Sequence, residues 1–93
     1  MSLLLKDPEA SIDYSMDWGA RYLSDDTLME SSWSVVPTEP GGVLVVGSSA
    51  DEKVATVQVT GGVPGRMYRL VNHVITGAGR EDSRSIMLRV EER

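Results

Sequence analysis

The chain has 93 residues, no cysteine and a formal net charge of -5, and 41% of its residues are hydrophobic. Its length is close to the ~100 residues of one immunoglobulin-like domain, so we expect a single core. The acidic balance gives no support to nucleic-acid binding, and the lack of cysteine excludes disulfides and cysteine-based zinc sites.

Residues 1–10 are predicted to form an N-terminal arm or an edge strand, and residues 11–93 the body of the domain. Leu3 to Leu5 are only three apolar residues, far short of the ~7–15 of a signal-peptide core. No later run approaches the ~20 apolar residues of a membrane-spanning helix. We therefore expect synthesis in the cytoplasm and no membrane partner.

The clearest strand covers residues 12–18, where even positions are apolar or aromatic and odd positions are polar. This alternation is typical of a strand with one buried and one solvated face. A polar loop follows, and a second strand is expected over residues 28–36 with Met29, Trp33 and Val35 on one face.

The next strand begins at residues 43–46, which are apolar on both faces. Two interpretations remain open: the outward side chains contact another subunit, or the chain's own loops cover them. After a polar turn, residues 54–60 alternate again, with Ala55, Val57 and Val59 on the apolar face.

The longest predicted strand spans residues 67–76, and its even positions include Tyr68 and Leu70. Burying this set would also bury Asn72, whose amide would then need hydrogen-bond partners, unless a bulge near Val71 reverses the alternation.

Tyr68 follows the turn Pro64-Gly65. This position suits a tyrosine corner, in which the ring enters the core and the hydroxyl bonds nearby backbone.

A glycine-rich turn at residues 77–82 leads into a last alternating strand that ends near residue 90. Six strands are visible, and residues 2–6 are the candidate seventh at an edge. The sequence therefore predicts an all-β, antiparallel, immunoglobulin-like (fibronectin III-like) sandwich of six or seven strands. The side chains expected in its core are Tyr14, Trp18, Trp33, Val57, Tyr68, Leu70, Ile86 and Leu88.

No motif for catalysis or cofactor binding is present. His73 is the only histidine, so the usual zinc sets are excluded, and a Ser-His-Asp arrangement would have to use it. Asp25 and Asp26 lack the spacing of a calcium loop and are expected to stabilise a turn, with cation binding left open. We expect no cofactor, no metal and no small-molecule substrate. An enzyme using Asp25, Asp26 and His73 is the weakest functional hypothesis.

The candidate interface lies on the faces opposite the predicted core. It consists of Val71, Ile75 and Met87, together with Arg69 and Arg89. The first three would form an outward apolar strip, which is either an assembly surface or packing under a loop. Arginine suits protein interfaces because its guanidinium is planar and weakly hydrated, although arginine-rich composition alone would give the same bias. Further arginines considered as contact residues are Arg66, Arg80 and Arg84.

Charge is distributed unevenly along the chain. Residues 1–52 hold ten acids and two bases, and residues 53–93 hold four acids and seven bases. This asymmetry fits head-to-tail contacts between copies, or equally a surface of scattered solubilising charge. Because a small core without disulfides gains stability from partners, we expect a homo-oligomer in an assembly.

Five motifs follow one another in order: Asp13-Tyr14-x-x-Asp17-Trp18; Ser32-Trp33; Ala55-Thr56-Val57; Gly61-Gly62-x-x-Gly65-x-x-Tyr68-x-x-x-Asn72; and Gly79-Arg80-x-Asp82-x-Arg84-Ser85-Ile86-x-Leu88-Arg89-Val90. Together they resemble small virion proteins of tailed phages described as fiber-tail or head-tail adaptors. The resemblance covers most of residues 6–93.

The resemblance implies a non-enzymatic structural protein of the virion, copied around a tail or connector and docked to other virion proteins. The family offers no catalytic residues. The alternative is a fibronectin III-like carbohydrate-binding or spacer module of a secreted protein, in which Trp18 and Trp33 would stack on sugars.

Overall fold

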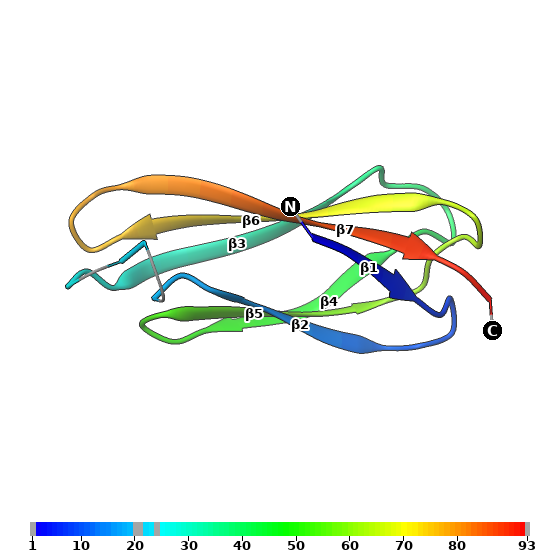
Figure 1. Cartoon of the computed structure of the whole chain (residues 1–93), viewed down its shortest axis with the longest axis horizontal. Helices are drawn as coiled ribbons and strands as arrows, with labels where there is room; N and C mark the ends of the chain where they lie inside the picture. Colours follow the sequence, from blue (N-terminus) through cyan, green and yellow to red (C-terminus); the bar gives the residue numbers. More distant parts are fainter. Residues whose placement is uncertain (1, 20–21, 24, 93) are drawn as a thin grey trace.

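The computed structural model describes residues 2–19, 22–23 and 25–92. These residues form seven strands and no helix, in two layers (Figure 1). Hence no helix that could span a membrane occurs in this part of the chain. The strands are β1 (Ser2–Lys6), β2 (Ile12–Asp17), β3 (Leu28–Val36), β4 (Leu44–Ala50), β5 (Val54–Thr60), β6 (Met67–Thr76) and β7 (Glu81–Val90).

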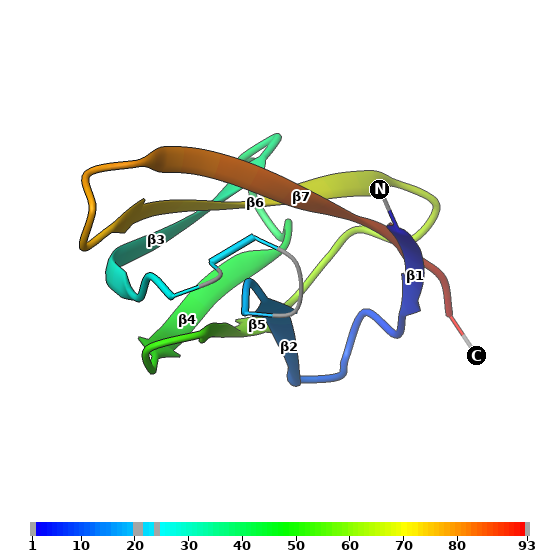
Figure 2. The same cartoon turned by 60° about the vertical axis from the view of Figure 1, so that its left-hand side comes forward.

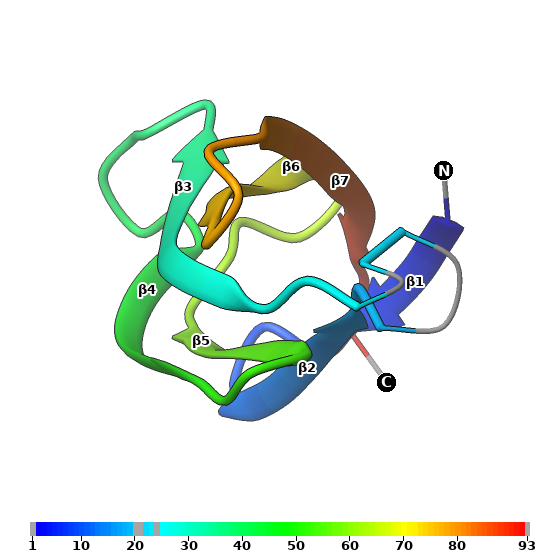
Figure 3. The ribbon, with the colours of Figure 1, turned by 90° about the vertical axis from the view of Figure 1, so that its left-hand side faces the viewer.

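The strands form a four-stranded sheet in the order β1-β7-β6-β3 and a three-stranded sheet in the order β2-β5-β4. The two sheets face each other, with β3 beside β4 along one side (Figure 3). This confirms the predicted all-β sandwich. The orders β7-β6-β3 and β2-β5-β4 are compatible with an immunoglobulin-like arrangement.

One pairing departs from the antiparallel prediction, because β1 runs parallel to β7. β1 and β2 lie in different sheets, so residues 7–11 carry the chain from one layer to the other. A hairpin between β1 and β2 is therefore impossible, and β1 instead lies at the edge beside the last strand.

The alternation of β6 is unbroken. Tyr68, Leu70, Asn72 and Val74 are all buried, and β6 pairs with β7 without a register shift at Val71. Of the two alternatives that the sequence allowed, the structure therefore has the buried asparagine.

Two predicted core side chains, Tyr14 and Trp33, are only half-buried. Both lie on edge strands, and both pack against the core. The Tyr14 hydroxyl and the Trp33 Nε1 are buried without a hydrogen-bond partner among the described residues, and burial raises the pKa of Tyr14. The other predicted core residues are buried: Trp18, Val57, Tyr68, Leu70, Ile86 and Leu88.

The observed exposure of side chains on β3 and β4 decides two of the sequence expectations. A bulge between Leu28 and Glu30 turns Met29 outward, so its expected place beside Trp33 is wrong. In the following strand region, Val43 is buried, whereas Leu44 and Val46 are exposed. The chain's own loops therefore do not cover these two side chains.

Tyr68 has the geometry of a tyrosine corner. Its ring is buried, its hydroxyl accepts a hydrogen bond from the Val63 N–H (3.0 Å), and it donates one to the Glu39 carboxylate (2.8 Å). Burial, partly opposed by the Val63 hydrogen bond, raises the pKa of Tyr68. The hydroxyl thus joins the turn before β6 to the loop after β3.

Tyr68→Phe is expected to lower the free energy of unfolding by about 1 kcal/mol, because the Val63 N–H and Glu39 lose a partner. Urea unfolding measures this change. Tyr14→Phe is the matched control, since its hydroxyl is unpartnered and its removal should leave stability unchanged or slightly increased. Equal stability of Tyr68→Phe and the unmodified protein would contradict the role of the corner.

Candidate docking surface

The outer face of the four-stranded sheet gathers exposed apolar side chains from every strand. Its register places Leu3 beside Met87, Met87 beside Arg69, and Arg69 beside Val36. One row of side chains therefore crosses all four strands. In the next row, Leu5 lies beside Arg89 and Arg89 beside Met67. We call these residues the outer patch: Leu3, Leu5, Val36, Met67, Arg69, Met87 and Arg89.

The apolar members of the outer patch are accessible. Leu3 is 58% exposed, Leu5 52%, Val36 57% and Met67 44%, while Met87 is half-buried between its neighbours. The strand periodicity produces this surface, because residues two apart project from the same face. Contiguous exposed apolar surface of this kind marks interaction sites.

The outer face of the three-stranded sheet has a different character. Its exposed large apolar side chains are Leu44 and Val46, both on β4. The paired positions on β5 and β2 are polar, including Gln58 opposite Asp13 and Thr56 opposite Ser15. The Ser15 and Thr56 hydroxyls share a hydrogen bond (3.1 Å). This face offers less apolar surface to a partner.

The predicted interface residues fall in two places on the four-stranded sheet. Arg69, Met87 and Arg89 lie in the outer patch. Val71 adjoins it on β6 but is flanked by Ser34 and Ser85. Ile75 lies near the other end of β6, opposite Glu30 and Glu81, so the strip imagined from the sequence is not continuous.

Sequence reasoning did not include Leu3, Leu5, Val36 and Met67 in the candidate interface, although periodicity placed Met67 on the outward face of its strand. The run of three leucines was the available signal, but its parallel pairing with β7 joins opposite ends of the chain and has no local sequence mark.

Most of the arginines considered as contact residues have partners inside the chain. Arg66 pairs with Glu39 (Nη1 to Oε2, 3.6 Å), and Arg89 pairs with Glu91 (Nε to Oε1, 2.7 Å). Arg69 forms no ion pair within the described part of the chain. It is therefore the arginine of the outer patch whose charge is most available to a partner.

Arg80 acts within the fold. Its guanidinium lies 4.7 Å from the centre of the Tyr22 ring and donates to the Leu23 carbonyl oxygen and to the Asp26 carboxylate, both at 3.3 Å. These contacts tie the loop before β3 to the β6–β7 turn.

Asp26 serves this loop contact. A hydrogen bond from the Thr76 side chain, with further bonds from the Thr27 and Ala78 N–H groups and from Arg80, holds the pKa of Asp26 below its usual value. These contacts of Asp26 agree with the expectation that it stabilises a turn.

His73 lies elsewhere, on the outer face of β6. Its Nδ1 is 2.9 Å from the Ser83 hydroxyl, and its Nε2 is 2.9 Å from the Glu81 carboxylate. Within the described ranges no hydrogen bond or ion pair joins Asp26 to His73, so the contacts give the enzyme hypothesis no support. Across the described ranges, no group of three or more metal-binding side chains is formed.

The carbohydrate-binding alternative requires exposed aromatic faces. The Trp18 ring is fully buried, with the Tyr22 ring 5.2 Å away in an edge-to-face arrangement. Trp33 is half-buried and contacts the core. The proposed sugar-stacking role of Trp18 is therefore wrong.

Comparison with protein families places the chain beside proteins of a phage tail. The sequence model of a family described as Podophage GP4 fiber-tail adaptor protein gp77 matches residues 6–89, which is nearly the whole chain. A search of curated proteins found no match. The matched range includes every member of the outer patch except Leu3 and Leu5.

Proposed function

Since the chain belongs to the podophage fiber-tail adaptor family, we propose that it docks another protein of the phage tail through the outer patch. The family is one of structural adaptors of the phage particle. Within that role, we propose a non-enzymatic action that consists of protein-protein contact alone. The chain is made in the host cytoplasm and joins the tail in several copies.

The observation that carries this proposal is the outer patch itself. Its exposed apolar side chains come from β1, β3 and β6, with the half-buried Met87 of β7 between them, so a partner meets a preformed sheet surface and no loop has to be ordered. The domain measures 42 × 20 × 17 Å. Its broad faces therefore suit an interface of the standard size, which buries about 800 Å² on each partner.

The proposed interface combines apolar and cationic contacts. Leu5 and Met67 flank the Arg89 side chain, and Met87 flanks Arg69. A partner with an apolar centre and carboxylates at its rim would match this surface. Docking of this kind excludes water from the leucine and methionine side chains, which supplies the attraction, while the arginines fix the orientation.

Leu5→Glu tests the proposal, with Leu44→Glu as its matched control. The two leucines have nearly equal exposure, 52% and 55%, but lie on opposite faces of the sandwich. Each variant would be supplied to a phage that lacks its own copy, and infective particles and the protein's copy number in purified particles would be counted. We expect Leu5→Glu to weaken docking by about 10- to 100-fold, because the interface loses the burial of an apolar side chain and has to remove water from a carboxylate.

Leu44→Glu should leave the count of infective particles unchanged. The proposal is wrong if Leu5→Glu particles contain the normal amount of protein and remain infective. It is also wrong if Leu44→Glu causes the same loss while both purified variants unfold cooperatively at the normal temperature.

A further inference from the structure

One edge of β7 is only half paired. β1 covers β7 from Ile86 to Val90, whereas residues 81–85 have a strand partner only on the β6 side. β1 and β2 belong to different sheets and form no ladder with each other, so neither of these strands pairs with residues 81–85 (Figure 2). Unpaired strand edges are the places where another extended chain can add.

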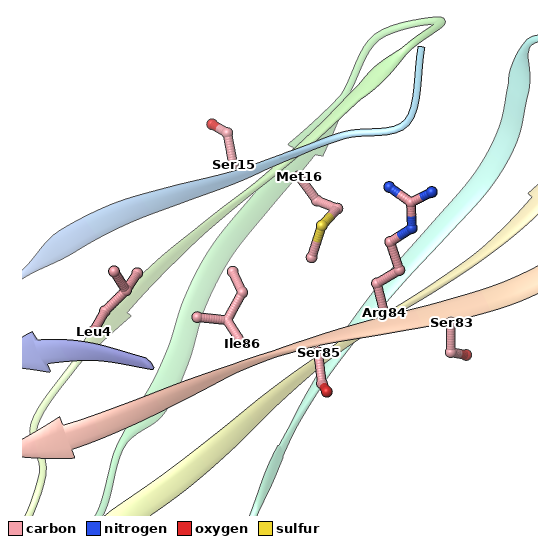
Figure 4. Close-up of a pocket in the computed structure, with 7 residues that line it drawn as sticks. All are labelled: Leu4, Ser15, Met16, Ser83, Arg84, Ser85 and Ile86. Carbon is pink, nitrogen blue, oxygen red and sulfur yellow. The ribbon is translucent and has the colours of Figure 1, made fainter. Parts of the chain in front are cut away.

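A cavity of about 670 Å³ lies beside this free edge, between β1, β2 and β7. Leu4, Met16, Ile86 and Arg84 point into it, while the serines of β2 and β7 point away (Figure 4). We call this space the lateral cavity. Its lining combines three apolar side chains with one cationic group, so an entering side chain would meet both.

Arg84 is held in place without a carboxylate partner. Its guanidinium carbon lies 4.4 Å from the Trp18 ring centre and 5.8 Å from that of Tyr22. Among the described residues it forms no ion pair. Stacking on aromatic rings leaves the N–H groups at the rim of the guanidinium plane, where a carboxylate can accept two of them.

The free edge itself shows the expected protection. The Ser83 N–H donates to the carboxylate of its neighbour Asp82 (2.8 Å) instead of to a strand. The Asp82 side chain thus accepts the hydrogen bond that this backbone N–H could otherwise donate to a neighbouring strand. An added strand would displace the Asp82 carboxylate and bond the Ser83 N–H directly.

We propose that the free edge of β7 and the lateral cavity bind an extended segment of another protein, which pairs with residues 81–85 and places one carboxylate side chain against Arg84. Directly opposed residues in a ladder face the same side of a sheet. The residue beside Arg84 therefore faces the cavity, and so does the residue beside Asp82. Beside Arg84 an acidic residue of the segment is favoured, because it meets a cation. Beside Asp82 an acidic residue is disfavoured, because it meets another carboxylate. This difference sets the register of the segment.

This inference does not depend on the outer patch, which lies on the other face of the same sheet. It concerns a second contact with a different partner chemistry: backbone hydrogen bonds and a single carboxylate, in place of a broad apolar surface. Two such contacts on one small domain would suit a protein that joins two components.

The test uses the full chain and three synthetic eight-residue peptides. The peptides alternate threonine and valine and differ only at one inward position, which is glutamate, glutamine or lysine. Amide chemical shifts of the labelled protein, followed during titration, give the site and the dissociation constant. We expect the glutamate peptide to bind about tenfold more tightly than the glutamine peptide and to shift residues 81–85, because the carboxylate gains charge-assisted hydrogen bonds.

Arg84→Gln should abolish the preference for glutamate, and Arg84→Lys should retain part of it. Arg69→Gln, which removes a charge from the opposite face, should leave the preference unchanged. Thermal unfolding checks that both Arg84 variants are folded. If Arg84→Gln does not fold, the comparison of peptide affinities is made with Arg84→Lys alone. Equal affinity for the three peptides, shifts that leave residues 81–85 and the lining of the lateral cavity unaffected, or no binding at millimolar peptide would overturn the proposal. Concentration-dependent shifts of the same edge without peptide would assign it to a second copy and would also overturn it.

Discussion

Asn72→Ala is expected to lower the free energy of unfolding by about 3–5 kcal/mol, because a buried hydrogen-bond network would lose its centre. Asn72 is fully buried. Its Oδ1 accepts from the Trp18 Nε1–H (2.8 Å), and its Nδ2 donates to the Ser31 hydroxyl (2.9 Å) and the Ser32 carbonyl oxygen (3.0 Å). The amide thus joins the segment after β2 to β3 and β6, across the two sheets.

Alanine at this position would leave the buried Trp18 N–H without its partner, would remove the hydrogen bonds to Ser31 and Ser32, and would create a cavity. Urea unfolding followed by tryptophan fluorescence measures the change. Ser31→Ala removes one of the three hydrogen bonds and should cost about 1 kcal/mol. If both variants lose the same small amount of stability, the asparagine is not the centre of the network.

Gly61→Ala is the second substitution with a large expected effect, about 3 kcal/mol or more. Gly61 has a φ of +79°, which strains any residue with a Cβ, and an added Cβ would lie 2.6 Å from the Gly42 carbonyl oxygen. The obstacle is backbone, so it cannot rotate away. The Gly61 carbonyl oxygen also accepts a hydrogen bond from the buried Lys6 Nζ (2.6 Å) and fixes the loop from its other side.

Gly65→Ala separates the two causes. Gly65 has a similar φ of +84°, but an added Cβ would meet nothing within 4 Å. Its substitution should therefore cost only the conformational strain, roughly 1–2 kcal/mol. Thermal and urea unfolding of the two variants should differ clearly, and equal destabilisation would show that the close approach to Gly42 has no energetic effect.

The strands were predictable because their chemistry is local. Alternation from residue 12 to 18 and from 67 to 76 identifies a buried face without knowledge of the partner strand. Asn72 shows the limit of this reasoning. Periodicity placed it on the buried face, but only the positions of Trp18 and Ser32 in three dimensions explain how its amide is satisfied there.

Bulges and parallel pairing were not predictable from the sequence. The extra residue at Met29 reverses the face of one side chain without any proline or glycine to mark it. The pairing of β1 with β7 joins residues more than 80 positions apart, so the exposure of Leu3 and Leu5 on a common face with Met87 had no local signal. This long-range pairing completes the outer patch.

The roles of the arginines depend on neighbours that composition does not reveal. Arg69 could be placed on the outward face from periodicity alone. Arg80 and Arg84 could not be assigned, because their stacking on Tyr22 and Trp18 depends on the course of the loop after β2. The residue type alone therefore indicated that these arginines make contacts. The three-dimensional structure was needed to show which of those contacts lie within the chain.

A cryo-EM reconstruction of the purified phage tail, at a resolution that shows side chains, would test the proposed role most directly. We expect Leu5, Met67 and Met87 to be buried against another tail protein, with Arg69 near a carboxylate of that partner. An assembled tail in which the outer face of the four-stranded sheet is open to solvent would contradict this assignment, as would purified tails that lack the protein.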